Sequence, residues 1–370
     1  MKLAIVTTHP IQYNAPLFRL MAKQKDLEIH VFFSRTSEQM SYDPDFQRQV
    51  IWDTPLTDGY THSRVDATGT VGIENLKQSV KSFKPHALIV YGWNFPGHRQ
   101  MIRTFYGQIP VGFRGDSHLL NPMTFWKRWL RKAVLHRIYR HVDLAFSVGT
   151  ANTAYFQWSG MPEANIVLAP HSVDNAYWQQ DAIARQQAAE QWKTELGIPK
   201  TDSAIGFAGK LEPLKQVDLL IKAFERIASQ KIHLIIAGTG PDEEKLKQQA
   251  ANHPRIHFAG FVNQSRMPIF YRMLSAFVLP SSSETWGLSV NEALACGTRC
   301  MVSNRVGCGQ DIFKDPRLGT IVKWDRPFQW TSELETLLKN PEIEGDALHA
   351  FLETYSYSAL IEALPKLWST

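Results

Sequence analysis

Two glutamates lie eight positions apart, as Glu284 and Glu292, in the stretch SSSETWGLSVNEALACG, residues 281–297. The stretch follows a strand-like apolar run, and its second half has helical spacing that stops at Gly297. Free backbone N–H groups at such a helix start form an anion site. Acids there would repel phosphate, but they can accept hydrogen bonds from hydroxyls, one from a sugar and the other from a ribose. The alternative is a solvated loop acid and a favourable acid near a helix start.

Two further loops carry residues suited to a diphosphate. Lys210 leaves an apolar run, and Lys215 lies near the start of the next helical pattern, where the helix dipole disfavours a cation unless an anion binds there. Gly238 and Gly240 form a G-x-G turn between another run and another helix, which alone is weak evidence for a nucleotide. If these loops share one sheet edge, they combine cations, hydrogen-bond acceptors and a close-approach turn.

The elements that position these loops alternate along the chain. Short β-branched runs are separated by helical patterns. The runs lie at 3–6, 27–33, 87–91, 109–115, 143–149, 165–170, 204–209, 232–238, 256–262, 276–281, 299–304 and 319–324. Such runs are typical of parallel strands buried on both faces, in right-handed βαβ units. The 370 residues suit two domains, and the polar, helix-favouring segment 176–200 separates the two sets of runs. We therefore predict an α/β protein of two Rossmann-like domains, with residues 34–64 rich in loops.

The segments GFAGKLEPLKQVDLLIKAF, LIIAGTGPDEEKL, HFAGFV and LPSSSETWGLSVNEALACGTRCMVSN resemble the C-terminal half of retaining glycosyltransferases of family 4, over about 206–324. The resemblance implies the GT-B fold, with two domains facing a central cleft. It implies an N-terminal acceptor-binding domain at 1–175, a nucleotide-sugar-binding domain at 176–350, and a C-terminal helix at 351–370 that packs back on the first domain. Gln216 departs from the family pattern, which has Gly there.

The resemblance also implies roles for individual residues. Glu284 would contact the donor sugar, and Glu292 the ribose hydroxyls. Lys210 and Lys215 would neutralise the diphosphate, so no metal and no cofactor are expected. The donor site would be completed by the glycine turn and by backbone amides near the phosphate, at Gly238, Gly240, Trp286, Gly287 and Leu288.

The first half supplies candidates for the acceptor side. His9, Gln12, Tyr13 and Asn14 follow the first strand and can all hydrogen-bond a sugar, although a polar loop that caps a helix explains them equally well. A second group follows the run at 109–115. There we expect Arg114 to bind the acceptor, and Asp116 and His118 to act with Glu284 in catalysis, by orienting the acceptor and stabilising developing charge.

The strongest charge feature is WKRWLRKAVLHRIYRHVD, residues 126–143, which predicts a basic amphipathic helix with tryptophans at one end. Contact of 126–140 with an anionic membrane surface and an ordinary solvated helix are equally good interpretations. The three cysteines lack metal or disulfide spacing and are expected to be buried hydrophobes in a reducing cytosol. We expect a cytoplasmic protein, with peripheral attachment to the inner face of the cytoplasmic membrane as the alternative that the basic helix leaves open.

The function that these residues favour is retaining transfer of a hexosyl or N-acetylhexosaminyl group from a UDP- or GDP-sugar. The acceptor would be a saccharide or lipid-linked saccharide, in surface polysaccharide or glycoconjugate biosynthesis. Two alternatives remain open, a GT-B nucleotide-sugar epimerase and a non-catalytic nucleotide-sugar-binding protein. The net charge of +5 clusters in one helix and no nucleic-acid module accompanies it, so we expect no nucleic-acid partner.

Overall fold

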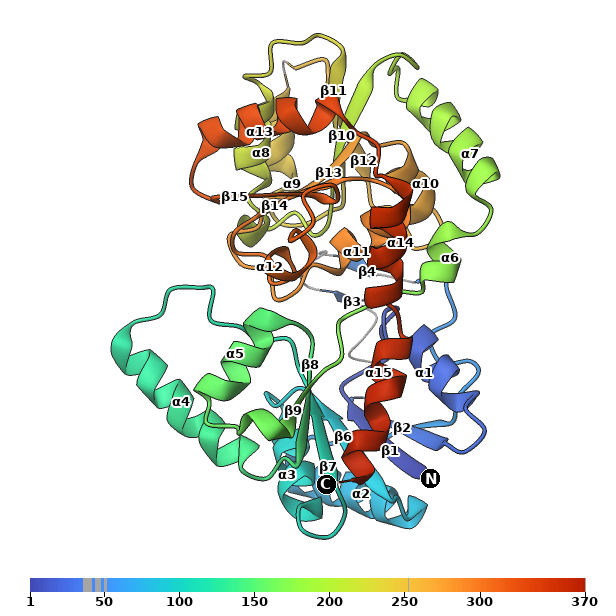
Figure 1. Ribbon diagram of the computed structural model, residues 1–370, viewed down its shortest axis with the longest axis vertical. Coiled ribbons are helices and arrows are strands. Elements are labelled where there is room, and N and C mark those ends of the chain that lie inside the picture. Colours follow the sequence, from blue (N-terminus) through green and yellow to red (C-terminus); the bar gives the residue numbers. More distant parts are fainter. Residues whose placement is uncertain (36–41, 44–47, 50–51, 252, 370) are drawn as a thin grey trace. The chain divides into compact units, whose positions relative to one another are not determined.

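The protein is described from a computed structural model, which covers residues 1–35, 42–43, 48–49, 52–251 and 253–369 (Figure 1). The chain divides into two compact units, each built on its own parallel sheet. Unit 1 comprises Met1–Ser41, Thr54–Asp174 and Ser356–Thr370, and unit 2 comprises Tyr42–Asp53 and Asn175–Tyr355. Both ends of the chain lie in unit 1 (Figure 1).

The sheet of unit 1 has the strand order β5-β2-β1-β6-β7-β8-β9, and all its pairs are parallel. The order turns outward in both directions from β1 and β6, so the loops after these two strands flank a topological switch point. The strands are β1 (Lys2–Thr7), β2 (Glu28–Phe33), β5 (His62–Arg64), β6 (Ala87–Tyr91), β7 (Val111–Arg114), β8 (Leu144–Ser147) and β9 (Ile166–Leu168).

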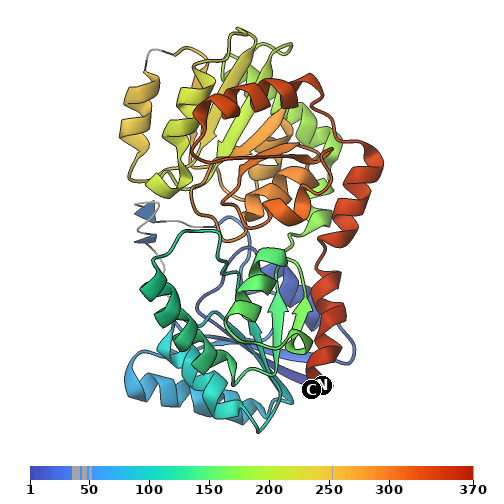
Figure 2. The ribbon, with the colours of Figure 1, turned by 60° about the vertical axis from the view of Figure 1, so that its left-hand side comes forward.

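Helices cover both faces of this sheet because the strand residues alternate between two apolar cores. In β1, Ala4 and Val6 enter one core, whereas Leu3 and Ile5 enter the other. The first core is closed by α2 (Gly69–Phe83), α3 (Pro96–Phe105), α4 (Phe125–Tyr139) and α5 (Thr150–Trp158). The second core is closed by α1 (Ala15–Ala22), α15 (Ser358–Ala363) and the 3-10 helix η4 (Leu364–Trp368), as Figure 2 shows.

Unit 2 repeats the same winding. Its sheet has the order β12-β11-β10-β13-β14-β15, again parallel throughout, with the switch point between β10 and β13. The strands are β10 (Ser203–Ala208), β11 (Ile232–Ala237), β12 (Ile256–Gly260), β13 (Ala276–Leu279), β14 (Cys300–Ser303) and β15 (Gly319–Val322). A separate antiparallel pair of unit 2 is β3 (Tyr42–Asp43) with β4 (Arg48–Gln49).

The helices of unit 2 begin where the chain enters it. They are α6 (Asn175–Gln179), α7 (Ala182–Glu195), the 3-10 turn η3 (Pro213–Lys215), α8 (Val217–Phe224), α9 (Glu243–Ala250), α10 (Met267–Arg272), α11 (Leu288–Ala295), α12 (Gly309–Ile312), α13 (Pro327–Lys339) and α14 (Gly345–Thr354). A further 3-10 turn, η2 (Glu163–Asn165), precedes β9 in unit 1. None of the helices in the described part of the chain is long and apolar enough to cross a membrane.

The predicted fold class is confirmed, and a strand forms within or across each of the apolar runs named above. Three short strands within 34–64 were not predicted: β3 and β4 pair with each other, and β5 pairs with β2 at the sheet edge. The signal for β5 is weak for a physical reason. Its three residues carry no apolar alternation, so the period-2 signal is missing.

The two units divide the chain at Asp174/Asn175 and at Tyr355/Ser356, and unit 2 also takes in Tyr42–Asp53. Tyr355 still packs on unit 2, where its ring centroid lies 6.2 Å from that of Trp286.

The chain crosses between the units at Asp174/Asn175 and again at Tyr355/Ser356, and the two crossing segments are hydrogen-bonded to each other within each unit. In unit 1, the Ser172 hydroxyl donates to the Ser356 carbonyl at 3.0 Å. In unit 2, the Asn175 side-chain amide donates to the carbonyls of Leu352 and Tyr355 at 3.0 and 3.1 Å. The segment from Ser356 onwards therefore joins unit 1 through specific bonds as well as through apolar packing.

Candidate functional site

Lys215 and Glu284, two of the predicted donor-site residues, meet at the switch point of unit 2. Lys215 ends η3, in the loop after β10, and Glu284 lies in the loop after β13. The Lys215 ammonium lies 2.5 Å from Glu284 Oε2, and each side chain is 18% exposed. Adjacent strands whose connections diverge leave a crevice at their carboxyl ends, which explains why residues 69 positions apart meet here.

The backbone of Glu284 is fixed as firmly as its side chain. Its N–H donates to the Arg305 carbonyl at 3.2 Å, and its carbonyl accepts from Gly307 at 3.0 Å. The loop after β13 is thus joined to the loop after β14, which holds the carboxylate in place towards Lys215.

The start of α11 follows directly after this loop. Gly287 precedes the helix with φ 98°, a left-handed conformation that favours glycine, and a Cβ there would come within 3.0 Å of Leu279 and Val306 side chains. Trp286 is buried, and its indole N–H donates to the Asn291 side chain at 2.9 Å. Leu288 begins the helix, and the Val290 N–H already donates to the Gly287 carbonyl at 2.9 Å, so the amides of Leu288 and Ser289 are the ones without an acceptor within the helix.

Gly238 and Gly240 pack against the neighbouring loop that carries Lys210. A Cβ on Gly238 would lie 1.9 Å from the Gly209 carbonyl oxygen, and one on Gly240 would lie 2.5 Å from the Leu211 carbonyl oxygen. The Leu211 N–H also donates to the Thr239 carbonyl at 2.9 Å. These glycines are therefore required for the close approach of two backbone loops, in addition to any role beside a nucleotide.

Glu292 is a buried carboxylic acid in the second turn of α11, and only 3% of it is exposed. The Tyr271 hydroxyl donates to its Oε2 at 2.7 Å, whereas its Oε1 is buried and makes no well-aligned hydrogen bond within the described residues. Burial raises the pKa of Glu292 to about 7, and the side chains of Tyr271 and Gln264, which act as donors to the carboxylate, lower it. The site thus holds an acceptor oxygen that a donor hydroxyl could satisfy.

Gln216 lies between Lys215 and α8 with φ 53° and ψ 37°. This left-handed conformation explains why glycine is the common residue in the family that the chain resembles. The side-chain amide of Gln216 donates to the Pro213 carbonyl at 2.8 Å, which holds the turn that presents Lys215.

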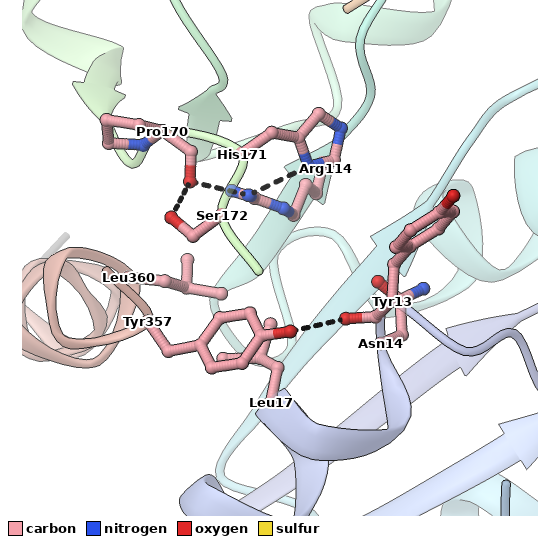
Figure 3. Close-up of a pocket in the computed structure, with 9 residues that line it drawn as sticks. All are labelled: Tyr13, Asn14, Leu17, Arg114, Pro170, His171, Ser172, Tyr357 and Leu360. Carbon is pink, nitrogen blue, oxygen red and sulfur yellow. Dashed lines mark hydrogen bonds between the residues drawn. The ribbon is translucent and has the colours of Figure 1, made fainter. Parts of the chain in front are cut away.

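Arg114 is the centre of the polar cluster in unit 1 (Figure 3). It ends β7, is 4% exposed, and donates to the carbonyls of Ala169 and Pro170 at 2.8 and 3.3 Å. Its Nη2 lies 3.5 Å from His171 Nδ1. These bonds direct the guanidinium at the loop after β9, and its predicted role in acceptor binding stays a prediction.

His171 completes this cluster and was not predicted as a site residue. Burial lowers its pKa to about 3, the Arg114 charge acts in the same direction, and Asp116 opposes them. The ring is therefore neutral, and because Nδ1 faces the Arg114 donor, we assign the proton to Nε2, which lies 4.0 Å from Asp116 Oδ2. The only signal in the sequence was its place after a strand, in PHSVD.

Asp116 and His118 both lie in the loop after β7, but the structure gives them different surroundings. The Asp116 carboxylate is 42% exposed and faces His171. His118 Nδ1 accepts a hydrogen bond from the Leu120 N–H at 3.2 Å, which leaves the proton of a neutral ring on Nε2. Glu284, the third predicted catalytic residue, lies in unit 2.

The predicted residues of the first loop surround the start of α1. His9 Nδ1 lies 3.0 Å from the Thr8 hydroxyl, and Gln12 is half-buried. Tyr13 and Asn14 line a small pocket with Arg114, His171 and Tyr357 (Figure 3). The Tyr357 hydroxyl donates to the Tyr13 carbonyl at 3.0 Å, so the segment that returns from unit 2 fixes the loop with the predicted acceptor residues.

Among the residues that the structure describes, no group of three or more His, Cys, Asp or Glu side chains is placed to hold a metal ion. Cys296, Cys300 and Cys308 are free and buried, as expected.

Comparison with known proteins gives a family likeness over the second half of the chain. The family model of glycosyl transferases group 1 matches residues 188–368. A D-inositol 3-phosphate glycosyltransferase of Corynebacterium glutamicum is 29% identical over 197 residues, which cover 50% of this chain and 47% of the relative. The enzyme of the same name from Mycobacteroides abscessus is 31% identical over 152 residues, covering 40% and 34%. The chain thus spans about half the length or less of the curated relatives it matches.

Solved structures extend the likeness to the whole fold. Sucrose-phosphate synthase from Thermosynechococcus elongatus has a TM-score of 0.77 at 16% identity, covering 100% of this chain and 98% of that one. Anabaena HepE, solved in complex with UDP, has a TM-score of 0.76 at 14% identity, and each chain is covered in full. The chain therefore has the GT-B glycosyltransferase fold, and over residues 188–368 it is similar to glycosyl transferases group 1.

Proposed function

We propose that this protein is a retaining glycosyltransferase that transfers a hexosyl or N-acetylhexosaminyl group from a UDP- or GDP-sugar to a saccharide or lipid-linked saccharide. Its place would be in surface polysaccharide or glycoconjugate biosynthesis, in the cytoplasm or on the inner face of the cytoplasmic membrane. The observation that carries the proposal is the arrangement at the start of α11, where the Lys215–Glu284 pair lies in the loops after β10 and β13 and the buried acid Glu292 follows in the helix. The matched family model and a neighbour solved with UDP support a nucleotide-sugar donor.

When the donor binds, Lys215 would exchange its partner, from the Glu284 carboxylate to the diphosphate. A diphosphate carries more charge than one carboxylate, so it competes for Lys215 and releases Glu284. The released carboxylate can then accept hydrogen bonds from hydroxyls of the transferred sugar. Lys210, from the same loop, and the α11 amides would add to the diphosphate site.

Glu292 has the chemistry for the ribose. Its Oε1 is buried and makes no well-aligned hydrogen bond among the described residues, and a ribose hydroxyl is a donor that would satisfy it. The hydrogen bond would favour the ionised form of the carboxyl, so nucleotide binding should lower the pKa of Glu292 from about 7.

In the proposed reaction, the bond between the sugar anomeric carbon and the diphosphate oxygen breaks. The acceptor hydroxyl forms a bond to the same face of that carbon, and its proton passes to the departing phosphate oxygen. Lys215 and Lys210 would stabilise the charge that develops on the diphosphate. His118 and Asp116 would orient the acceptor, which is the role the resemblance implies for them.

Nucleotide binding tests the donor half of the proposal. A thermal-shift screen of UDP- and GDP-sugars should show stabilisation of about 2.7 kcal/mol at 100 times the Kd. In calorimetry, Lys215→Ala should weaken nucleoside diphosphate binding about tenfold or more, because charge-assisted bonds are lost. Lys222→Ala is the matched control, since Lys222 lies in the adjacent α8 and pairs with Asp218. Equal affinities of the two variants would remove Lys215 from the site.

Turnover tests the chemistry. Glu284→Gln should lower transfer strongly, whereas nucleoside diphosphate affinity should rise about two- to fivefold, because Lys215 no longer has to leave a partly buried carboxylate. Weaker diphosphate binding by this variant would contradict the exchange of partners. Conversion of the donor to an isomer without an acceptor would identify an epimerase, and tight binding without turnover on any acceptor would identify a binding protein.

A further inference from the structure

The first half of α4 exposes large apolar side chains. Phe125, Trp126 and Trp129 are 86%, 62% and 66% exposed, and Leu130 and Val134 are exposed as well. These five residues, which we name the α4 apolar face, lie at positions i, i+1, i+4, i+5 and i+9 from Phe125 and so share one half of the helix circumference. Isolated apolar residues on a surface are ordinary, but a contiguous group with two tryptophans marks an interaction site.

The opposite side of α4 holds the helix on unit 1. Leu135, Ile138 and Tyr139 are buried in the core. Arg131 lies one helical turn before Leu135 and Arg128 lies two turns before it, so both continue this inward row. The guanidinium of Arg131 lies 5.4 Å from the ring centroid of Tyr155, and that of Arg128 lies 5.5 Å from the ring centroid of Trp158, both in α5. The helix is thus anchored through its inward row, and the apolar face is not needed to hold it in place.

The six cations of the basic helix therefore divide into two sets. Arg128 and Arg131 stack on α5, and Arg131 also donates to the Tyr155 hydroxyl at 3.1 Å. The other four are exposed and flank or extend the apolar face: Lys127, Lys132, Arg137 and Arg140.

The segment of sequence that carries these cations contains no acidic residue. Between Asp116 and Asp143 the sequence has no Asp or Glu over 26 residues, while it has six Lys and Arg. An exposed helix that had only to stay soluble would gain from mixed charges and i,i+4 ion pairs, as α9 has between Glu243 and Lys247. The charge here complements an anionic surface.

We infer that the α4 apolar face docks on a membrane surface that contains anionic lipid. Phe125, Trp126, Trp129 and Leu130 enter the interfacial layer, where tryptophan is favoured. The four exposed cations contact the headgroups, each contributing about fivefold to the affinity. A lipid surface fits better than a folded protein partner because the two tryptophans and the cations lie together on one exposed helix, where they can enter the interfacial layer and contact headgroups at the same time. The inference deepens the membrane location given with the proposed function, and failure of vesicle binding would leave donor binding and transfer to a soluble acceptor untouched.

Flotation with vesicles tests the inference on the full chain. Wild type should float with vesicles of phosphatidylcholine and phosphatidylglycerol but not with phosphatidylcholine alone, and added salt should release it. Trp126→Ser/Trp129→Ser should reduce binding about tenfold or more. The matched control is Val71→Ser/Ile183→Ser, which removes two equally exposed apolar side chains from α2 and α7 and should bind as wild type does.

The cations are tested by a second pair of variants. Replacement of Lys127, Lys132, Arg137 and Arg140 by Gln should abolish binding to anionic vesicles, whereas Lys23→Gln/Lys25→Gln, two exposed lysines of unit 1, should leave it unchanged. Tryptophan quenching by lipids brominated on their acyl chains reports insertion in the wild-type protein without any substitution.

Three outcomes would overturn the inference. Wild type that floats no better with anionic than with neutral vesicles has no lipid-binding surface of this kind. Loss of binding in the cation variant but not in the tryptophan variant reduces α4 to a general anion-binding surface, which nucleic acid would also occupy. A dimer in sedimentation that the tryptophan variant dissociates, without vesicle binding, makes the face a contact between copies of the chain.

Discussion

Arg114 in unit 1 and Glu292 in unit 2 are both charged residues buried near the carboxyl ends of parallel strands, but their hydrogen bonding differs. Arg114 directs its donors at two backbone carbonyls and a neutral histidine. Glu292 has one oxygen bonded to Tyr271 and a second, buried oxygen that makes no well-aligned hydrogen bond in the described part of the chain, although the Gln264 side chain also acts as a donor to the carboxylate. Leaving a buried polar atom unpaired is costly.

We interpret the difference as one between a charge that is satisfied within the fold and a charge for which we propose a ligand. Arg114 gains its partners from the loop after β9 and so stabilises the fold of unit 1 by itself. Glu292 is incompletely satisfied in the fold, and burial accordingly raises its pKa to about 7. A ligand with a hydroxyl donor would complete its bonding, so part of the binding free energy is already stored in the site.

The largest effect is expected from Arg114→Met. The carbonyls of Ala169 and Pro170 would lose their donors, and the free energy of unfolding should fall by about 3 kcal/mol. Urea unfolding measures it, with Arg103→Met on the exposed side of α3 as the control. If Arg114→Met unfolds as wild type does and loses only transfer activity, Arg114 is an acceptor ligand after all, and the comparison fails.

Glu292→Gln should have the opposite profile. Nucleoside diphosphate affinity should fall by a factor of about ten or more, because the ribose loses a charged acceptor, while stability at neutral pH should not fall. Calorimetry and urea unfolding on the same samples give both numbers, and Glu335→Gln, on the exposed side of α13, is the control. A variant that is destabilised yet binds as wild type does would make Glu292 a structural residue.

The pH dependence sharpens the same point. The pKa of Glu292 is raised in the folded state from 4.5 to about 7, so its contribution to stability is fully present below about 4.5 and is lost as the pH rises through about 7. The stability advantage of Glu292→Gln over wild type should therefore widen by about 2 kcal/mol between these pH values. Nucleotide binding should show the reverse trend and tighten with pH in wild type alone. A constant stability gap would mean that Glu292 titrates normally.

The smallest effect concerns the turn before α8. Gln216→Gly removes a left-handed side-chain residue at φ 53° and should change stability by less than about 1 kcal/mol, because relief of backbone strain is offset by loss of the bond to Pro213 and by greater chain entropy. Gln216→Val should cost more, since a β-branched residue resists this conformation. Equal stability of Gln216→Gly and Gln216→Val would show that the left-handed conformation at this position carries no strain, which would contradict the prediction.

Local patterns in the sequence predicted the fold well. The β-branched runs correspond to strands because burial on both faces requires continuous apolar residues, and β5 was missed because an edge strand of three polar residues does not. The glutamate motif located the start of α11, and Gln216 was noticed as a departure whose reason, a positive φ, only the backbone could reveal.

The side-chain pairings within the site could not be predicted from the sequence. Lys215 meets Glu284 across 69 positions, and Arg114 meets the Ala169 carbonyl across 55, so each contact depends on strand order rather than on local spacing. His171 gave no signal of its own because its neutral state depends on burial and on the charge of Arg114. Tyr271, which donates to Glu292, likewise lies on a helix whose residues carry no motif.

The return of the chain at Ser356 sets an order of events during synthesis. Residues 175–355 emerge from the ribosome as a continuous stretch that contains the whole parallel sheet of unit 2. Unit 1 is begun earlier, but Leu360, Leu364 and Leu367, which close one face of its sheet, are translated only after unit 2. The half that starts first therefore finishes last, and the face of its sheet that α1 covers only in part keeps apolar residues exposed throughout the interval, when a chaperone would be needed most.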